Sequence, residues 1–204
     1  NLGLLDIGCG NGFFCGLAAK KGYEYYGLDT SPEMIKRAET EHNKGHYSMF
    51  EATNFSKNYQ IKFAVVLIIQ LFPAFKNRED MVSTLREAKK VLNPNGVVII
   101  GVSHPNFDRY MEKGLFNNTT VKTKFKGYFN SGAKMMISHN FNDEKYIFED
   151  YHWLLEDYAE CIKKGGLVIS EIDECKPDIN AKKADQTFYK SRTQYPTYLL
   201  FVCK

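Results

Sequence analysis

The sequence predicts an α/β fold, in which a mostly parallel, doubly wound sheet of seven strands is covered by helices on both faces. Two observations lead to this prediction: short apolar runs alternate with amphipathic runs, and a glycine-rich turn joins the first apolar run to the first helical one. The length of 204 residues suits one domain, so we expect residues 1–204 to fold as a unit. We expect strands at 4–7, 24–28, 46–51, 62–69, 96–102, 167–174 and 197–203, and helices at 13–21, 32–42, 78–91 and 153–164.

The first strand and its turn carry the strongest signal, the run LLDIGCGNG at positions 4–12. Glycines at 8, 10 and 12 permit a tight turn with positive φ and let a ligand approach the main chain. A strand, a glycine turn and a helix in this order present backbone N–H groups at the carboxyl end of the strand. A dinucleotide fingerprint would need its third glycine at 13, where Phe13 stands, and no G-K-[ST] follows, which excludes a P-loop.

The second strand ends in an acid, Asp29, about 20 residues after the glycine turn. Ser31 then suits the N-cap of the following helix, with Pro32 at its first position. An acid at this place can hold a ribose diol, one carboxylate oxygen for each hydroxyl. The alternative is that Asp29 only caps the helix.

The later elements continue the alternation. The longest apolar stretch, 63–69, has the length of a buried strand. The turn LNPNG at 92–96 separates the helix at 78–91 from the next strand.

The pattern D-x-G-x-G-x-G at 6–12, followed by Asp29, resembles the first two motifs of the class I S-adenosylmethionine (SAM) dependent methyltransferases. The LNPNG turn resembles the L-K-P-G-G turn of that family, and YPTYLLFVCK at 195–204 resembles its last strand. The resemblance implies a Rossmann-like sheet whose last strand inserts antiparallel between its neighbours. It also implies an enzyme that uses SAM and releases S-adenosylhomocysteine.

The resemblance also implies a set of cofactor-binding residues. The glycine turn would lie under the methionine part of SAM, Asp6 would hold its amino end and Asp29 its ribose. EATNF at 51–55 stands where the family often has D-A-x-x-L, which places Glu51 and Ala52 at the adenine, with Glu51 one methylene longer than the usual acid. The full predicted set is Asp6, Gly8, Gly10, Gly12, Asp29, Thr30, Met34, Glu51, Ala52, Ile68 and Gln70.

Three members of that set have alternatives. Met34 either packs on the adenine or belongs to the core side of its helix. Ile68 and Gln70 either border the methionine moiety or serve the sheet core and the entry to the next helix. The fourth strand also departs from the family, because it begins Phe63-Ala64 in place of F-D and ends in IIQLFPAF. The absence of an N-P-P-Y-like motif there disfavours methylation of DNA bases and glutamine.

Residues 105–150 form a segment too long for an ordinary connection between a strand and a helix. Related methyltransferases carry a substrate-binding insert at this place, so we expect a lid over the active crevice. Within it, 121–126 alternates apolar and lysine residues and could form a hairpin with 133–141 across the turn at 130–132.

The chain lacks an initiator Met and starts just before the first strand, so we also expect that a native N-terminal segment is missing.

Two histidines are the catalytic candidates. His104 lies in SHPNF at the carboxyl end of the fifth strand, where open α/β sheets bind ligands. It resembles the H-P-x-F turn of some small-molecule methyltransferases, and His152 resembles a histidine at the entry to their next helix. Either histidine could act as a base or contact the substrate, although a lone histidine is often structural.

Composition limits the remaining possibilities. The five cysteines are scattered with no C-x-x-C pair, so we expect no metal site, no disulfide framework and a cytoplasmic location. No run reaches the length of a membrane span, and a net charge of +3 is too small to indicate nucleic acid.

We therefore expect methyl transfer to an O, N or C atom of a small molecule. Two alternatives stay open: an RNA methyltransferase that uses the lysines at 122, 124 and 126, and a SAM-binding protein without catalysis. Those lysines also fit an edge strand protected by charge.

Overall fold

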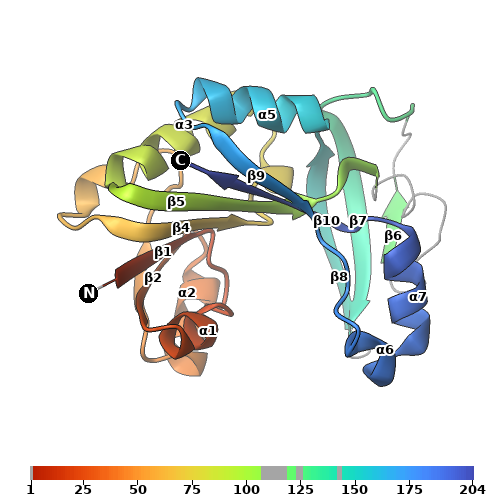
Figure 1. Ribbon diagram of the computed structural model, residues 1–204, viewed down its shortest axis with the longest axis horizontal. Coiled ribbons are helices and arrows are strands. Elements are labelled where there is room, and N and C mark those ends of the chain that lie inside the picture. The colour runs from red at the N-terminus through yellow and green to blue at the C-terminus, as the bar shows by residue number, and fades with distance from the viewer. Residues whose placement is uncertain (1, 107–118, 123–125, 142–143) are drawn as a thin grey trace.

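The computed structural model describes residues 2–106, 119–122, 126–141 and 144–204. Its main sheet has seven strands in the order β3-β2-β1-β4-β5-β10-β9, and a separate three-stranded sheet has the order β6-β7-β8 (Figure 1). The strands of the main sheet are β1 (Leu2–Ile7), β2 (Tyr23–Asp29), β3 (His46–Met49), β4 (Phe63–Ile69), β5 (Leu92–Ser103), β9 (Ile169–Glu174) and β10 (Tyr198–Cys203). The α/β class and the seven-stranded sheet predicted from the sequence are confirmed.

Two pairs of helices cover the main sheet from opposite sides. One face carries α1 (Cys15–Lys20) and α2 (Pro32–Glu41), and the other carries α3 (Arg78–Val91) and α5 (Leu155–Lys164) (Figure 1). Two short 3₁₀ helices, η1 (Ser56–Asn58) and η2 (Phe72–Ala74), flank β4. No helix in the described ranges is long and apolar enough to span a bilayer.

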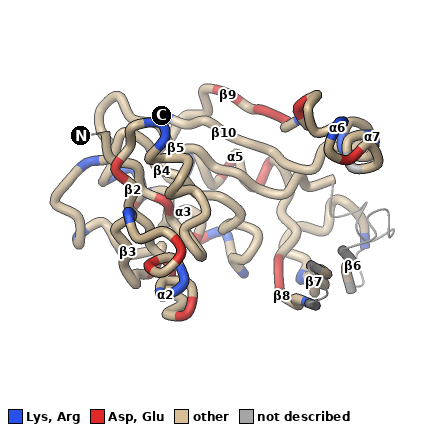
Figure 2. The backbone as a smooth tube through the Cα atoms, turned by 90° about the horizontal axis from the view of Figure 1, so that it is seen from below, with Lys and Arg blue, Asp and Glu red and all other residues tan. Residues whose placement is uncertain are grey.

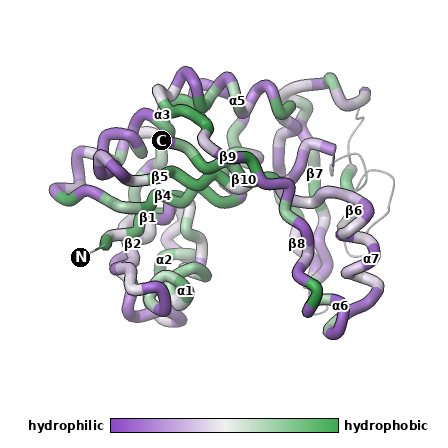
Figure 3. Tube along the Cα trace, viewed as in Figure 1, coloured by the Kyte–Doolittle hydropathy of each residue, from purple (hydrophilic) through white to green (hydrophobic). Residues whose placement is uncertain are grey.

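The last strand takes the place that the resemblance implied. β10 lies between β5 and β9 and pairs antiparallel with both, whereas β1, β2, β3, β4 and β5 pair parallel. The central strands β1, β4, β5 and β10 are among the most hydrophobic parts of the chain (Figure 3). The parallel arrangement directs the carboxyl ends of five strands to one edge of the sheet, where the site is built.

The hydrophobic core is divided by the sheet into unequal halves. Alternate residues of β1 serve the two sides: Leu5 and Ile7 belong to the large cluster with α3 and α5, while Leu4 belongs to a small cluster with α1. The large cluster includes Phe63, Leu85 and Phe201, with no exposed surface. Its extent explains why α3 and α5 are the most firmly packed helices.

The expected turn at 92–96 takes an unexpected form. These residues are part of β5, but the pairing with β4 steps from Phe63↔Leu92 to Val65↔Val97. Between these two pairs lie one residue of β4 and four residues of β5, so the LNPNG segment bulges out of the ladder. The LNPNG segment therefore separates α3 from the regularly paired part of β5 without forming a conventional loop.

The insertion after β5 forms the second sheet, made of β6 (Thr119–Lys122), β7 (Ala133–Phe141) and β8 (Glu144–His152). β6 pairs antiparallel with β7, as the expected hairpin required, and β7 pairs antiparallel with β8. Thr123, Lys124 and Phe125, on which the expected alternation also depended, lie outside the described residues, as do 107–118 of the expected lid. Its function as a lid stays a prediction.

Two helices were not expected from the sequence. α6 (Ala181–Ala184) and α7 (Gln186–Gln194) precede β10 (Figure 1). The residues of this segment are mostly polar, with lysines at 182, 183 and 190, so the sequence has no clear apolar stripe there.

Candidate functional site

The glycine turn at 8–12 lies between β1 and α1 and requires its glycines. Gly8, Gly10 and Gly12 have φ of 75°, 53° and 79°, values that other residues seldom adopt. A Cβ on Gly12 would come within 2.7 Å of the Tyr47 hydroxyl, whereas a Cβ on Gly10 would meet no heavy atom within 4 Å. Gly12 is therefore needed for packing beneath the turn, and Gly10 faces open space.

Asp29 links the two predicted motifs directly. The Gly10 amide donates to Asp29 Oδ2 at 3.0 Å, and the Ser31 amide donates to Asp29 Oδ1 at 2.9 Å. Ser31 also caps α2, since its Oγ accepts a hydrogen bond from the Met34 amide at 3.3 Å. A carboxylate has about four acceptor positions, so one on each oxygen stays available for a ligand.

A cavity of about 300 Å³ opens beside this acid, at the carboxyl ends of β1, β2 and β3. Five of the predicted cofactor residues line it: Gly8, Asp29, Thr30, Glu51 and Ala52. Six others were missed: Leu28, Phe50, Thr53, Leu71, Phe75 and Asp80. Phe50 adjoins the predicted EATNF segment and Thr53 belongs to it, so both could have been added, whereas Phe75 and Asp80 lie beyond β4 and have no local signal.

Asp6 lies beneath the turn and is only 2% exposed. Its Oδ2 accepts a hydrogen bond from the Tyr25 hydroxyl at 2.6 Å. Burial raises the pKa of Asp6 to about 6, although the hydrogen bond from Tyr25 opposes that rise. Asp6 does not line the cavity, so a direct contact with a cofactor stays a prediction.

Three other predicted cofactor residues, Ile68, Met34 and Gln70, do not line the cavity. Ile68 is fully buried in the core, and Met34 lies on α2 outside the cavity lining. Gln70 follows β4 with φ of 57°, and its Oε1 accepts a hydrogen bond from the Ser103 hydroxyl at 3.1 Å. A non-glycine residue with positive φ at a strand end is uncommon and often marks a functional position.

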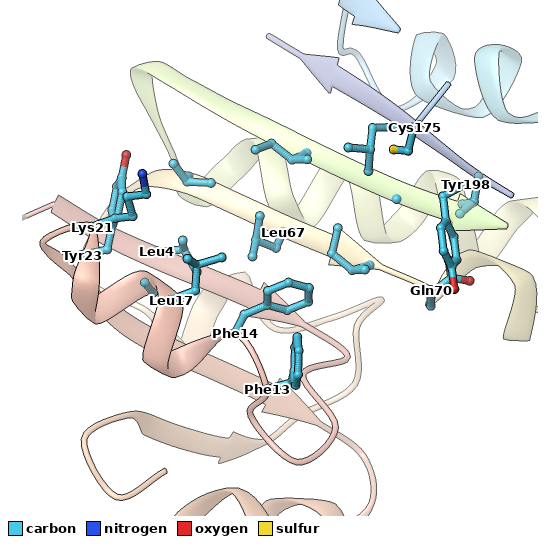
Figure 4. A pocket seen from close by; sticks show the side chains of 17 residues that line it. Leu4, Phe13, Phe14, Leu17, Lys21, Tyr23, Leu67, Gln70, Cys175 and Tyr198 are labelled. Carbon is cyan, nitrogen blue, oxygen red and sulfur yellow. The ribbon is translucent and has the colours of Figure 1, made fainter. Parts of the chain in front are cut away.

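Gln70 borders a second, larger hollow of about 730 Å³ on the face of the sheet that carries α1. Most of its lining is apolar, from Leu4, Leu67 and Phe14 at the centre, while Gln70 and Tyr198 lie together at one end (Figure 4). The small size of the core cluster on this side agrees with the hollow.

His104 is held by both of its ring nitrogens. It is 8% exposed, its Nδ1 accepts from the Asn106 amide at 3.1 Å, and its Nε2 lies 3.2 Å from Glu174 Oε1. Because Nδ1 accepts, Nε2 carries the proton and donates to Glu174. His104 would have to exchange one of these partners before it could accept a proton from a substrate.

His152 is enclosed at the base of the second sheet. It has no exposed surface, and its Nε2 donates to the Tyr128 carbonyl at 2.7 Å. In this conformation it secures the chain before β7 to the end of β8. A catalytic role for either histidine stays a prediction.

The described residues offer no metal site. No group of three or more His, Cys, Asp or Glu side chains in this part of the chain is arranged to bind a metal ion. The five cysteines are all free thiols, and burial raises the pKa of the Cys9 thiol, which lies within the glycine turn, so Cys9 is a poor nucleophile.

Comparisons with known proteins agree with this geometry. The putative methyltransferase YqeM of Bacillus subtilis is 24% identical over 93% of this chain and 85% of its own length. A ubiquinone biosynthesis O-methyltransferase of a Bradyrhizobium species is 27% identical over 53% of this chain and 43% of its own length.

Solved structures show the same fold. A SAM-dependent methyltransferase of Mesorhizobium loti superposes with a TM-score of 0.71 at 18% identity, covering 100% of this chain and 90% of the other. A putative SAM-dependent methyltransferase of Listeria monocytogenes gives 0.68 at 22% identity, covering 99% and 89%. The family model described as "Methyltransferase domain" matches residues 1–196. The chain is therefore an enzyme that belongs to the class I methyltransferases, the family whose cofactor is S-adenosylmethionine.

Proposed function

We propose that this enzyme transfers a methyl group from SAM to an O, N or C atom of a small-molecule acceptor. The observation that carries the proposal is the fixed carboxylate of Asp29, which is oriented by two amides and has an acceptor position free on each oxygen beside a cavity. The curated O-methyltransferase relatives act in ubiquinone biosynthesis, which supports a small molecule as acceptor.

The residues around the cavity fit the cofactor chemically. Asp29 would accept hydrogen bonds from the two ribose hydroxyls, and Glu51 with the Ala52 amide would meet the adenine edge. The rings of Phe50 and Phe75 provide apolar walls for a base. The open space over Gly10 leaves room for the ligand against the main chain.

Asp6 would act on the amino end of the cofactor through its charge. It is enclosed in a region of low dielectric, where a carboxylate acts over a longer distance than in water. The Tyr25 hydroxyl favours the ionised form of Asp6, because a hydrogen bond to a carboxylate stabilises its charge.

The chain's own contribution to catalysis is then mainly positioning. When bound, SAM supplies a methyl group already activated by its sulfonium sulfur. The protein has to align the acceptor atom and exclude water, and a base is needed only for an acceptor that arrives protonated. His104, at the carboxyl end of β5, is our candidate for that base or for a hydrogen bond to the acceptor.

The cofactor assignment is tested by calorimetric titration of SAM into Asp29→Ala. We expect affinity to fall at least tenfold, which corresponds to about 1.4 kcal/mol. Glu33→Ala is the matched control, because Glu33 is an exposed acid in the first turn of α2 outside the cavity. An unchanged dissociation constant in Asp29→Ala, with the fold intact by circular dichroism, would refute the ribose assignment.

The acceptor class is tested by a screen of small molecules that follows release of S-adenosylhomocysteine. Turnover with small phenols, amines or acids supports the proposal. Turnover only with RNA, accompanied by a steep loss of affinity with salt, would overturn it in favour of an RNA methyltransferase. Tight SAM binding without turnover on either class would favour a protein that binds SAM without catalysis.

A further inference from the structure

β8 is an edge strand with an open stretch in its middle. In the described part of the chain the second sheet has the order β6-β7-β8, so β8 pairs on one side with β7. The residues 145–149 are all exposed, and Tyr146, Ile147 and Phe148 are 47%, 61% and 45% exposed. Because neighbouring residues of a strand point to opposite faces, exposed side chains lie on both faces of this stretch.

A long edge strand with exposed apolar residues is a template for pairing with another strand. The sequence of this stretch, Lys145-Tyr146-Ile147-Phe148-Glu149, determines which strand would fit. In an antiparallel pair of two copies centred on Ile147, Lys145 of each copy stands opposite Glu149 of the other, and Tyr146 stands opposite Phe148. Opposite charges and aromatic side chains directly across from each other stabilise a sheet.

Of the registers centred on Tyr146, Ile147 and Phe148, only the one centred on Ile147 places Lys145 opposite Glu149. Moving the centre to Tyr146 or to Phe148 separates Lys145 from Glu149 and places an apolar residue opposite at least one of them. One step beyond the stretch, the register centred on Ile147 would place Glu144 opposite Asp150, so the favourable pairing is limited to five residues.

The edge of the main sheet formed by β9 provides a contrast. Its residues are also largely exposed, but Glu171, Asp173 and Glu174 make that edge acidic (Figure 2). Two copies of β9 paired antiparallel about Ile172 would place Glu171 opposite Asp173, and like charges across a pair are destabilising. The self-complementary edge is therefore a property of β8.

The geometry points to β8 as the contact surface between two copies of this chain, joined antiparallel about Ile147 so that the two second sheets form one continuous sheet. The contact is isologous, because each copy contributes the same five residues. Five residues from each copy make an interface well below the usual size of about 800 Å² per partner, so the dimer is weak and depends on concentration.

Glu149 already has partners within its own chain, and these are compatible with the pairing. It forms an ion pair with Lys134 and accepts a hydrogen bond from the Tyr151 hydroxyl at 2.5 Å. Its side chain is nevertheless 38% exposed, and a carboxylate has acceptor positions for a further cation. These contacts hold Glu149 in place on the edge strand.

The test is sedimentation equilibrium of the whole chain, up to roughly 500 µM, so that a dimer of the weak class is populated. We expect the wild type to show a dimer, and Lys145→Glu and Glu149→Lys each to raise its dissociation constant about tenfold or more, because two attractive pairs become repulsive. An equimolar mixture of the two variants restores both opposite-charge pairs, so we expect a heterodimer of wild-type strength. Lys163→Glu, at an exposed lysine of α5, is the matched control for a charge reversal.

Three results would overturn the inference: a wild type that stays monomeric over this range, a dimer that survives both single reversals, or a mixture that does not associate. A monomeric wild type would show that Lys145 and Glu149 protect the edge of β8 from association. Circular dichroism and SAM titration of each variant verify that the fold and the cofactor site are unchanged, which separates this test from that of the proposed function.

Discussion

Replacing Asp6 by Asn tests the electrostatic state of the acid beneath the glycine turn. Burial raises its pKa from 3.8 to about 6 in the folded protein, a shift of about two units. Each unit corresponds to about 1.4 kcal/mol, so ionised Asp6 costs the folded state about 3 kcal/mol. Between pH 4 and 6 the folded state holds a proton that the unfolded state has released. The stability of the wild type, relative to Asp6→Asn, therefore falls as pH rises through this range and stays low above it.

The assay is urea unfolding of both proteins at pH 4, 5, 6 and 7.5. We expect the difference in unfolding free energy to change by about 2.4 kcal/mol in favour of Asp6→Asn between pH 4 and pH 7.5, because the unfolded carboxyl is already partly ionised at pH 4. Tyr25→Phe removes the hydrogen bond that opposes the rise in the pKa of Asp6, so its pH profile should extend to higher pH. Parallel profiles for the wild type and Asp6→Asn would refute the reasoning. If the charge also serves the cofactor, Asp6→Asn should bind SAM more weakly at pH 7.5.

Two further predictions concern the glycine turn and the histidine candidate. Gly12→Ala should lower the unfolding free energy by about 2 kcal/mol, because φ at Gly12 is 79° and the new Cβ would meet the Tyr47 hydroxyl. Gly16→Ala is the control, because a Cβ on Gly16 inside α1 would meet no heavy atom within 4 Å. It should raise the unfolding free energy by about 0.5–1 kcal/mol. Equal effects in urea unfolding would contradict this account of the turn. His104→Ala should lower kcat at least about tenfold and leave SAM affinity nearly unchanged. Equal losses of both in steady-state kinetics and calorimetry would mean that His104 shapes the pocket instead.

The local signals in the sequence were sufficient for the main sheet. The glycine turn, the Ser31 cap and the apolar run of β4 each specify an element through neighbouring residues, and these elements lie within a few residues of where they were expected. The antiparallel place of β10 has no local cause and came from the resemblance alone. α6 and α7 were missed because their residues are mostly polar and give no clear helical stripe.

The candidate site was predictable only in part for the same reason. Asp29 ends β2, and Glu51 and Ala52 come within three residues of the end of β3, so their place at the carboxyl edge could be inferred. Phe75 and Asp80 reach the same cavity through η2 and the start of α3, and nothing in their local sequence indicates this. The bonding of His104 depends on Glu174, which is 70 residues away along the chain. Its tautomer could therefore be inferred only from the folded arrangement.

The second sheet and the cavity are physically connected at the base of the insertion. Asp157 accepts hydrogen bonds from the Ser131 hydroxyl at 2.5 Å and from Arg78 at 3.0 Å, which joins the turn before β7 to α5 and α3. Trp153, just after β8, donates its Nε1 hydrogen to the Phe75 carbonyl at 3.2 Å, and Phe75 lines the cavity. Asp157 is 5% exposed and Trp153 6%, whereas the side chain of Arg78, which donates to Asp157, is 45% exposed. The base of the insertion and the cavity wall therefore form one unit.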